Sequence, residues 1–455
     1  MTATFETHEI RRALGLSTGS GTRHFSGVSI DSREVQAGHL FVALQGARVA
    51  GSDYLEQAAR SGAIGAIVPA GLNMPDLDME WFPVPDTLRA LGELARFVRR
   101  RGSARVVGVT GSSGKTTVKE MMALALSESV PTWATPGNLN SLTGLPLAIL
   151  RADPEARYWV LELGSSAPGE VARLTAIAEP DDVVVTTVGA AHLEGFGDID
   201  GVLREKLSLI RLAHASGRAV VGELPAELAT AARQIREQVV VAGLGPDADF
   251  RPDRYEVGAE SVSFERSGIE YRLHVGGEHH LRDALLAAAM VEQLGVEPDA
   301  VARGLAKFRP LGMRGALIRA GSLTIVADCY NANPESFEAA IKFCESSFPG
   351  RPRSAVVSSM LELGADSAAA HRGVASRLLD AGFERIFALG EFRGAFEQTS
   401  NGKDRVATAG SVAEAIAGIA DGISEGEVVL VKASRGERLE RVVEGLVKRC
   451  GEGSS

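Results

Sequence analysis

The sequence contains few cysteines and lacks any long apolar run. Its three cysteines, Cys329, Cys344 and Cys450, are odd in number and form no Cys-x-x-Cys pair, which indicates a reducing compartment and argues against structural zinc. Every apolar run is shorter than the roughly 18 residues that a transmembrane helix needs, and Met1–Glu6 lacks the basic and then apolar character of a secretory signal. We therefore expect a cytoplasmic protein without a membrane span.

An excess of positive charge is also absent. The chain has 48 lysines and arginines against 58 aspartates and glutamates, a formal net charge of −10 at pH 7. This balance argues against general binding of nucleic acid, although local cations and backbone N–H groups can still hold phosphates. With 455 residues, 45% of them hydrophobic, the chain is long enough for about two to four globular domains. These properties predict a cytosolic enzyme.

The N-terminal part has the pattern of a small α/β unit. Short apolar strands are predicted at 28–30, 40–43 and 64–68, with a helix at 54–61. A longer helix is predicted over Thr87–Arg101, because its last three arginines suit the helix dipole and the following Gly102 suits a C-terminal cap. We place the first domain boundary there.

Strands and helices alternate through the rest of the chain. Buried-type strands are predicted at 105–109, 158–163, 182–188, 323–327, 354–358, 385–389 and 427–431. Repetition of strand, helix and strand predicts parallel, doubly wound sheets. Between 254 and 275 the apolar period changes to two around Arg266-Ser267-Gly268, which predicts a β-hairpin. With a second boundary at Arg309–Gly312, we predict three α/β domains, residues 1–102, 103–312 and 313–455.

The strongest motif is a glycine-rich turn between a buried strand and a helix, Gly111-Ser112-Ser113-Gly114-Lys115-Thr116-Thr117. Such a loop directs backbone N–H groups and the helix dipole at phosphate oxygens. Lys115 then supplies a point charge and the Thr116 hydroxyl a magnesium ligand. The spacing is shorter than the usual eight-residue pattern, and an ordinary turn with a surface lysine is the alternative. The strand and helix on either side favour the phosphate loop.

Two further polar residues follow predicted strands of the same sheet. Glu162 ends the strand at 158–163, and His192 and Glu194 follow the strand at 182–188. Taken alone, each is more often a loop or capping residue. Because α/β sheets bind ligands at the carboxyl ends of their strands, a phosphate loop at that edge makes Glu162 and His192 candidate site residues.

Lys206 lies on the apolar face of a predicted helix. Ile199, Val202, Leu203 and Ile210 form the stripe, and Lys206 falls inside it. An inward-pointing lysine is costly unless its stem carries the charge to water or the charge is paired or altered. Both interpretations remain open on this pattern alone.

With these residues in place, the sequence resembles the Mur ligase family over nearly its whole length. Asp31-Ser32-Arg33 and Gly38–Gly46 are similar to the family's uridine-binding domain. The motifs that carry the resemblance further are Thr135–Asn140, Glu162–Gly164, Ala191–Gly197, Asp328–Pro334, Leu361–Gly364 and Val431–Arg435. His-Leu-Glu-Gly-Phe-Gly and Tyr-Asn-Ala-Asn-Pro are typical of the branch that adds D-alanyl-D-alanine, whereas the Asp-Asn-Pro-Arg of the diamino-acid-adding branch is absent.

The resemblance implies an ATP-dependent ligase of cell-wall precursor synthesis. ATP would phosphorylate the terminal carboxylate of a UDP-N-acetylmuramoyl-tripeptide, and the amine of D-alanyl-D-alanine would attack the acyl phosphate. Bringing two anions together makes charge neutralisation the central problem of the first step. The implied architecture is a uridine-binding N-terminal domain, a central P-loop domain and a C-terminal Rossmann-like domain that closes over ATP.

The family pattern also implies roles for individual positions. Thr116 and Glu162 would hold one Mg²⁺, and His192 and a carbamylated Lys206 a second, since a carbamate turns the lysine into an oxygen ligand that a hard metal prefers. The remaining roles are as follows: Asp31, Ser32 and Arg33 bind the uridine part, Asn138, Ser165 and Ser166 face the precursor, Arg314 reaches the transferring phosphate, Asp328 holds the ribose, and Asn331 and Asn333 lie near the nucleotide or the incoming amine.

The sequence departs from the family pattern near the expected base site. Ser112-Ser113 replaces Thr-Asn, which should be tolerated because backbone groups do most of the binding there. His280 and Asp283 stand where the family reads adenine with amide side chains. We interpret Asp283 as an ionised acceptor for the adenine amino group. Either His280 restores a donor, as a neutral or a protonated imidazole, or the adenine lies partly in water.

Two alternatives to this function stay open. One is a related amide ligase that uses another amine or acceptor. The other is a non-catalytic nucleotide-binding homologue, although decay of a site should not spare Lys115, Glu162, His192 and Lys206 together. We expect a monomer that binds the UDP-linked precursor, D-alanyl-D-alanine, ATP and Mg²⁺.

Overall fold

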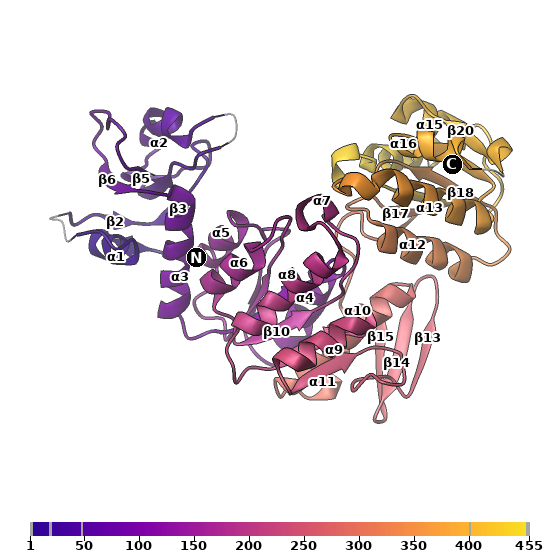
Figure 1. Cartoon of the computed structure of the whole chain (residues 1–455), viewed down its shortest axis with the longest axis horizontal. Helices are drawn as coiled ribbons and strands as arrows, with labels where there is room; N and C mark the ends of the chain where they lie inside the picture. The colour runs from indigo at the N-terminus through magenta and orange to yellow at the C-terminus, as the bar shows by residue number, and fades with distance from the viewer. Residues whose placement is uncertain (1–2, 18–20, 47–48, 400–401, 452–455) are drawn as a thin grey trace.

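The computed structural model describes residues 3–17, 21–46, 49–399 and 402–451. Residues 1–2 and 452–455, at the outer ends of the first and third predicted domains, lie outside the described residues. Figure 1 shows the N-terminal, central and C-terminal parts following one another in a bent row, with the N-terminal part at one end and the C-terminal part at the other.

The N-terminal part contains a parallel sheet flanked by helices. Its strand order is β3-β4-β5-β6. The elements are β1 (Phe5–Glu6), α1 (Thr7–Ala13), β2 (His24–Phe25), β3 (Gly27–Ser29), β4 (His39–Val42), α2 (Leu55–Arg60), β5 (Gly65–Pro69), β6 (Glu80–Val84) and α3 (Thr87–Arg101). The predicted helix at Thr87–Arg101 is confirmed, and the Asp86 side chain caps it by accepting from Arg89 N. β6 was not predicted from the sequence.

The central part contains a six-stranded parallel sheet in the order β12-β11-β10-β7-β9-β8. Its strands are β7 (Arg105–Thr110), β8 (Thr132–Ala134), β9 (Tyr158–Glu162), β10 (Asp182–Val185), β11 (Ala219–Gly222) and β12 (Val239–Ala242). Its helices are α4 (Lys115–Ser127), α5 (Gly144–Leu150), α6 (Glu170–Ala178), α7 (Leu193–Phe196), α8 (Ile199–Leu212), α9 (Ala226–Ile235), α10 (Glu278–Gln293) and α11 (Pro298–Ala306).

Helices cover both faces of this sheet because successive strand residues point to opposite sides. In β7, Val106 joins the core that contains α6 and α8, whereas Val107 and Val109 join the core that contains α4 and α10. Buried apolar residues on both faces are typical of parallel sheets. The doubly wound sheet predicted from the sequence is confirmed.

The predicted hairpin is also present, within a three-stranded antiparallel sheet. β14 (Val262–Arg266) pairs with β15 (Ile269–Leu273), and β13 (Arg254–Val257) pairs with the other side of β14. Ser267 and Gly268 both have positive φ, 52° and 82°, as a two-residue hairpin turn requires. The rings of Phe264 and Tyr271 stack with centroids 4.4 Å apart and join the core on α10.

The C-terminal part has a second six-stranded sheet in the order β16-β17-β21-β18-β19-β20, in which only the edge pair β16–β17 is antiparallel. Its elements are β16 (Ala316–Ala320), β17 (Leu323–Asp328), α12 (Pro334–Ser347), β18 (Arg353–Val357), α13 (Ser367–Asp380), β19 (Arg385–Ala388), α14 (Phe392–Glu397), β20 (Val406–Thr408), α15 (Val412–Ala420), β21 (Val428–Lys432) and α16 (Glu440–Gly451). This mostly parallel α/β pattern agrees with the sequence prediction.

The N-terminal and central parts share one hydrophobic core. Phe5 and Leu94 belong to the same cluster of buried residues as Val106 and Leu161 of the central sheet, and Arg99 of α3 donates to Ala178 O at 3.0 Å and to Asp181 Oδ2 at 2.8 Å. The C-terminal sheet has separate clusters. The first two parts therefore form one packed unit, and the boundaries after residues 102 and 312 remain predictions.

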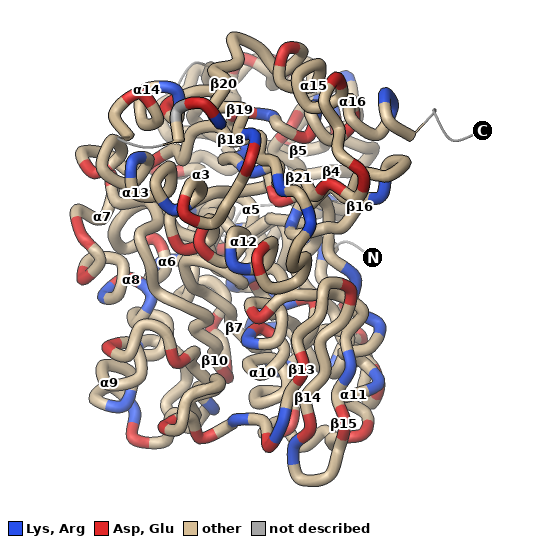
Figure 2. Tube along the Cα trace, turned by 90° about the vertical axis from the view of Figure 1, so that its right-hand side faces the viewer, with Lys and Arg blue, Asp and Glu red and all other residues tan. Residues whose placement is uncertain are grey.

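Charged residues of both signs are interspersed along the same elements. Figure 2 shows lysines and arginines alternating with aspartates and glutamates along the chain. Among the described residues, no helix combines the length and apolar character needed to cross a membrane.

The shared core predicts that the first two parts unfold together. Leu94 is fully buried, so Leu94→Ala should lower the free energy of unfolding by about 2–5 kcal/mol. Urea unfolding can be followed by Trp81 in the N-terminal part and by Trp133 and Trp159 in the central part. Each reporter variant keeps one of these tryptophans and has the other two replaced by Phe. We expect all reporters to shift equally.

Arg89→Ala is the matched control on the same helix, since that side chain is 78% exposed and its loss should change the stability by less than about 0.5 kcal/mol. A shift seen by Trp81 alone would contradict a shared core.

Candidate functional site

The glycine-rich loop between β7 and α4 is built on contacts that only glycine allows. Gly111 has φ 150° and Gly114 φ 80°. A Cβ at Gly111 would come within 2.0 Å of Thr186 Oγ1, and one at Gly114 within 2.4 Å of Asp283 Oδ1. Backbone N–H groups of Ser112 and Ser113 are held by Thr187, at 2.8 and 3.2 Å. The segment that follows the neighbouring strand β10 therefore pre-organises the loop.

Lys115 begins α4 and folds back over this loop. Its Nζ donates to Gly111 O at 2.7 Å. The ammonium group therefore lies over the loop, which is its expected place in a phosphate-binding loop. Burial lowers the pKa of Lys115, the nearby Glu162 carboxylate opposes that shift, and Arg314 adds to it. Lys115 thus lies within electrostatic range of both Glu162 of the central part and Arg314 of the C-terminal segment.

Glu162 lies at the end of β9 and is held in one orientation. Its Oε1 accepts from Asn140 Nδ2 at 2.7 Å, and its backbone N donates to Thr135 Oγ1 at 3.0 Å. Lys119, fully buried, steadies the same loop by donating to Thr135 O at 2.6 Å. Asn140 and Lys119 were not predicted as site residues, and only the position of Asn140 in the quoted Thr135–Asn140 motif pointed to it.

The second oxygen of Glu162 fits a metal ion. Oε2 is buried and has no hydrogen-bond partner in the described part of the chain, an arrangement that is costly unless a further group binds there. Across the residues that the structure describes, no group of three or more His, Cys, Asp or Glu could hold a metal ion by itself. An ion that takes its other ligands from phosphates and water, as Mg²⁺ commonly does, suits Glu162 and the Thr116 hydroxyl.

His192 and Glu362 face each other between the central and C-terminal parts. Both residues have left-handed backbone conformations, with φ 55° and 67°, which is uncommon for residues with side chains and is found at functional sites. The His192 ring faces the Glu362 carboxylate through Nδ1, a contact that is an ion pair only when the ring is protonated, and Glu362 O accepts from Glu194 N at 3.3 Å. Burial lowers the pKa of His192, Glu362 opposes that shift, and Lys115 and Lys206 add to it.

Lys206 of α8 points inward, as its place in the apolar stripe predicted, and is 1% exposed. Its Nζ donates to Ser165 Oγ at 2.7 Å and lies 5.6 Å from the centre of the Phe196 ring. Burial, followed by the positive charge of Lys115, lowers the pKa of Lys206 to about 7. The stem does not carry this ammonium group to water, so that interpretation of the sequence is excluded.

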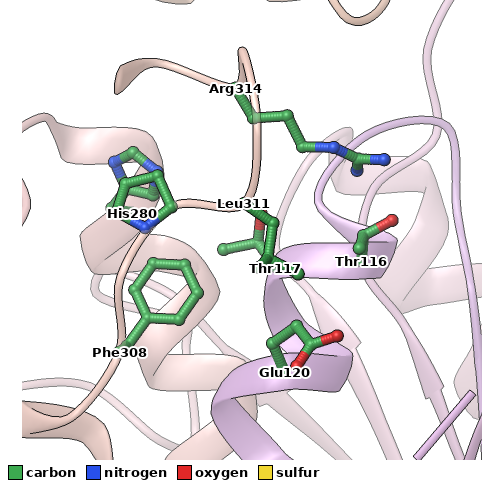
Figure 3. A pocket seen from close by; sticks show the side chains of 8 residues that line it. Thr116, Thr117, Glu120, His280, Phe308, Leu311 and Arg314 are labelled. Carbon is green, nitrogen blue, oxygen red and sulfur yellow. The ribbon is translucent and has the colours of Figure 1, made fainter. Parts of the chain in front are cut away.

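Arg314 closes the site from the segment that leads into the C-terminal sheet. Figure 3 shows its side chain extended over the start of α4, near Thr116. The pocket around it is lined by Thr116, Thr117, Glu120, His280, Phe308, Pro310, Leu311 and Arg314. Asp328, at the end of β17, forms an ion pair with the buried Lys432.

The structure bears on the expected hydrogen-bonding roles of His280 and Asp283. His280 Nδ1 lies 2.7 Å from Gly276 O, so Nδ1 is the donor and the neutral ring keeps only an acceptor at Nε2. Burial raises the pKa of Asp283 well above its usual value, which favours a neutral carboxyl that can also donate. Burial thus disfavours the ionised form of Asp283, and Gly276 leaves the neutral His280 ring without a free donor; the roles of both residues in binding adenine stay predictions.

The remaining predicted residues lie in three places. Asn331 and Asn333 line a second pocket together with His192, Leu361 and Glu362, and Asn333 also caps α12 by accepting from Ser336 N at 2.8 Å. The other side chains are placed as follows: Asn138 is exposed, Ser166 donates to Glu170, and, in the N-terminal part, Asp31 pairs with Arg33 and Ser32 donates to Gln57. Glu362 was not predicted as a site residue.

Three family models match consecutive parts of the chain. They are "Mur ligase family, catalytic domain" at residues 24–99, "Mur ligase middle domain" at residues 109–291 and "Mur ligase, glutamate ligase domain" at residues 313–435.

The chain is similar to curated UDP-N-acetylmuramoyl-tripeptide–D-alanyl-D-alanine ligases. It is 34% identical to that of Escherichia coli (strain K12), covering 92% of this chain and 93% of the relative. It is 32% identical to that of Bacillus subtilis (strain 168), covering 93% of each.

Solved structures of similar proteins have the same fold. MurF from Acinetobacter baumannii matches with a TM-score of 0.89 at 27% identity, covering 98% of this chain and 99% of that one. MurF ligase from Thermotoga maritima in complex with ADP matches with a TM-score of 0.84 at 30% identity, covering 93% and 98%. These similarities confirm the resemblance and the fold class predicted from the sequence.

The burial of Lys206 predicts an unusual titration. Because its pKa is lowered to about 7, Lys206 should be half neutral near neutral pH and become charged as the pH falls, whereas solvated lysines titrate near pH 10.4 (about the model-peptide value). NMR of lysine labelled with ¹³C at Cε, in buffer free of bicarbonate, measures the titration midpoint of Lys206 and those of the solvated lysines. The Lys206 signal is assigned by its loss in Lys206→Arg, and a midpoint above pH 10 would contradict the buried environment.

Proposed function

The chain belongs to the Mur ligase family, and on that premise we propose that it joins D-alanyl-D-alanine to a UDP-N-acetylmuramoyl-tripeptide at the cost of ATP. The observation that carries this proposal is the group of side chains at one edge of the central sheet. Lys115, Glu162, His192 and Lys206 lie there, and Arg314 approaches from the C-terminal side. Relatives that cover almost the whole chain are ligases of this kind.

The first step transfers the γ-phosphoryl group of ATP to the terminal carboxylate of the precursor. The P-loop from Gly111 to Thr117 holds the phosphates through the N-terminal end of α4 and its backbone N–H groups, while Thr187 occupies the N–H groups of Ser112 and Ser113. Lys115 and Arg314 offset the negative charge that accumulates as two anions approach each other. The nucleotide extends toward Asp283 and His280, with Asp328 at the ribose.

We assign two Mg²⁺ positions to this edge. Thr116 and Glu162 would hold one ion, which the unpaired Glu162 Oε2 supports, and His192 and a carbamate on Lys206 would hold the other. When bound, the ions supply positive charge that stabilises the phosphate oxygens in the transition state.

The environment of Lys206 supports carbamylation. A neutral amine adds to CO₂ to give a carbamate and releases one proton, and the lowered pKa keeps part of Lys206 neutral at pH 7. Ser165, which now accepts from Nζ at 2.7 Å, is placed to steady the modified group. The carbamate would turn Lys206, which lies near Lys115, His192 and Arg314, from a cation into an anion.

In the second step the free amine of D-alanyl-D-alanine attacks the acyl carbon, the C–N bond forms and phosphate leaves. The second pocket, with His192, Asn331, Asn333 and Glu362, lies between the central and C-terminal parts and suits the incoming amine. Glu362 restrains the His192 ring from the C-terminal side. On the other side of the molecule, Asp31, Ser32 and Arg33 would hold the uridine part, with Asn138 and Ser166 along the precursor.

Turnover of ATP should require both other substrates, because the acyl phosphate forms only on a bound carboxylate and is consumed only by the amine. Release of phosphate from ATP, measured with each substrate omitted in turn, tests this. We expect multiple turnovers only in the complete mixture. Full hydrolysis without the tripeptide precursor would contradict the proposal, and faster turnover with another amine or another UDP-linked acceptor would favour a related ligase instead.

Loss of the proposed carbamate should be partly reversible. Lys206→Ala should lose nearly all activity, and acetate should restore part of it by supplying the missing carboxylate oxygen. Activity is measured against acetate concentration at constant ionic strength, with chloride as the salt control. Lys119→Ala is the matched control, since Lys119 is a buried lysine whose Nζ is already held by the Thr135 and Gly137 carbonyls and by Glu120 and should gain nothing from acetate. A fully active Lys206→Ala enzyme would rule out the assigned role.

A further inference from the structure

Two guanidinium groups pack against one aromatic ring at the carboxyl edge of the C-terminal sheet. The Cζ of Arg314 lies 3.6 Å from the centre of the Tyr330 ring, and that of Arg435 lies 4.9 Å from it. Tyr330 follows β17 and Arg435 follows β21, which are neighbouring parallel strands, so both residues emerge at the same edge. Stacking restricts the motion of each guanidinium while leaving its N–H groups free to bind an anion.

Neither guanidinium has an acidic partner among the described residues. In the part of the chain that the structure describes, Arg314 and Arg435 form no ion pair and no side-chain hydrogen bond, and Arg435 is exposed. Of the other cations at this edge, Lys432 is buried and already paired with Asp328, and Arg438 is exposed and makes no cation–π contact with Tyr330. Arg314 and Arg435 are therefore the two cations that are held against this ring and available to a bound anion.

The two arginines stand beside different pockets. Arg314 lines the pocket next to the P-loop, where the transferring phosphate belongs. Arg435 adjoins the second pocket: a Cβ on the next residue, Gly436, would lie 2.8 Å from Leu361 Cδ1, and Leu361 lines that pocket with His192 and Asn331. Leu361 N also donates to Ser434 Oγ at 2.9 Å. This hydrogen bond connects the lining of the second pocket to the residue before Arg435.

The incoming dipeptide brings an anion of its own to this place. Its amine must reach the acyl phosphate near His192. Its terminal carboxylate is on the next residue and lies at most about 7 Å from that amine. A carboxylate that loses water when it enters a cleft needs a cation or several donors. The planar fork of an arginine matches a carboxylate with two parallel hydrogen bonds.

We propose that Arg435 binds the terminal carboxylate of the incoming D-alanyl-D-alanine and so selects an amine that carries a free carboxylate at that distance. This inference rests on the proposed function and adds a residue that determines which amine is accepted. Arg314 lines the pocket next to the P-loop and binds the phosphate, whereas Arg435 binds the carboxylate of the dipeptide.

The test compares D-alanyl-D-alanine with D-alanyl-D-alaninamide, whose terminal group is uncharged, in the unmodified chain and in Arg435→Gln. In the unmodified chain, kcat/KM for the amide should be about 10- to 100-fold lower than for the acid, the size expected for one lost charge-assisted pair. Arg435→Gln should lose a similar factor for the acid but discriminate little between acid and amide. KM for ATP should stay unchanged, which separates this effect from a general disturbance of the fold.

Arg438→Gln is the matched control, because Arg438 is an exposed arginine of the same segment that does not contact Tyr330. It should keep the full preference for the acid. Arg435→Gln with the unmodified preference, or an unmodified chain that uses acid and amide equally well, would overturn the inference. If the unmodified chain uses neither compound in the presence of ATP and the precursor, the proposed function itself fails.

Discussion

Two lysines at the carboxyl edge of the central sheet impose the main constraint on this molecule. Burial lowers the pKa of Lys206, and the charge of the nearby Lys115 lowers it further. His192 and Arg314 approach the same place. Buried positive charges so close together are costly, and bound phosphates and carboxylates offset that cost. The site is therefore adapted to reactants that are themselves anions.

The rest of the structure brings these groups together from two bodies. The N-terminal and central parts share one core, so the precursor-binding and P-loop regions keep a constant spacing. The C-terminal part has its own cores and contributes Glu362 and Arg435, while the segment leading into it contributes Arg314. Its contacts with the central part include the facing pair His192 and Glu362, both with positive φ, a hydrogen bond from Ala190 N to Glu335 at 2.7 Å and the packing of the His279 ring against Phe343.

Local patterns in the sequence predicted much of this arrangement. The helix Thr87–Arg101, the turn at Ser267-Gly268 and the buried Lys206 follow from caps, periodicity and positive φ, which depend on near neighbours in the chain. Asn140, Lys119 and Glu362 were missed because their importance comes from partners distant in sequence. The Gly276 carbonyl beside His280 and the burial of Asp283 bear on the protons of these two side chains, and neither is visible in the order of residues.

The central claim is that the precursor carboxylate is phosphorylated before the amide bond forms. The most direct measurement uses precursor labelled with ¹⁸O in its terminal carboxylate, together with ATP and D-alanyl-D-alanine, and mass analysis of the released phosphate. Attack of a carboxylate oxygen on the γ-phosphorus, followed by loss of phosphate from the acyl carbon, predicts one ¹⁸O in each phosphate molecule formed per amide bond. Phosphate that carries no ¹⁸O while the amide product accumulates would contradict the account.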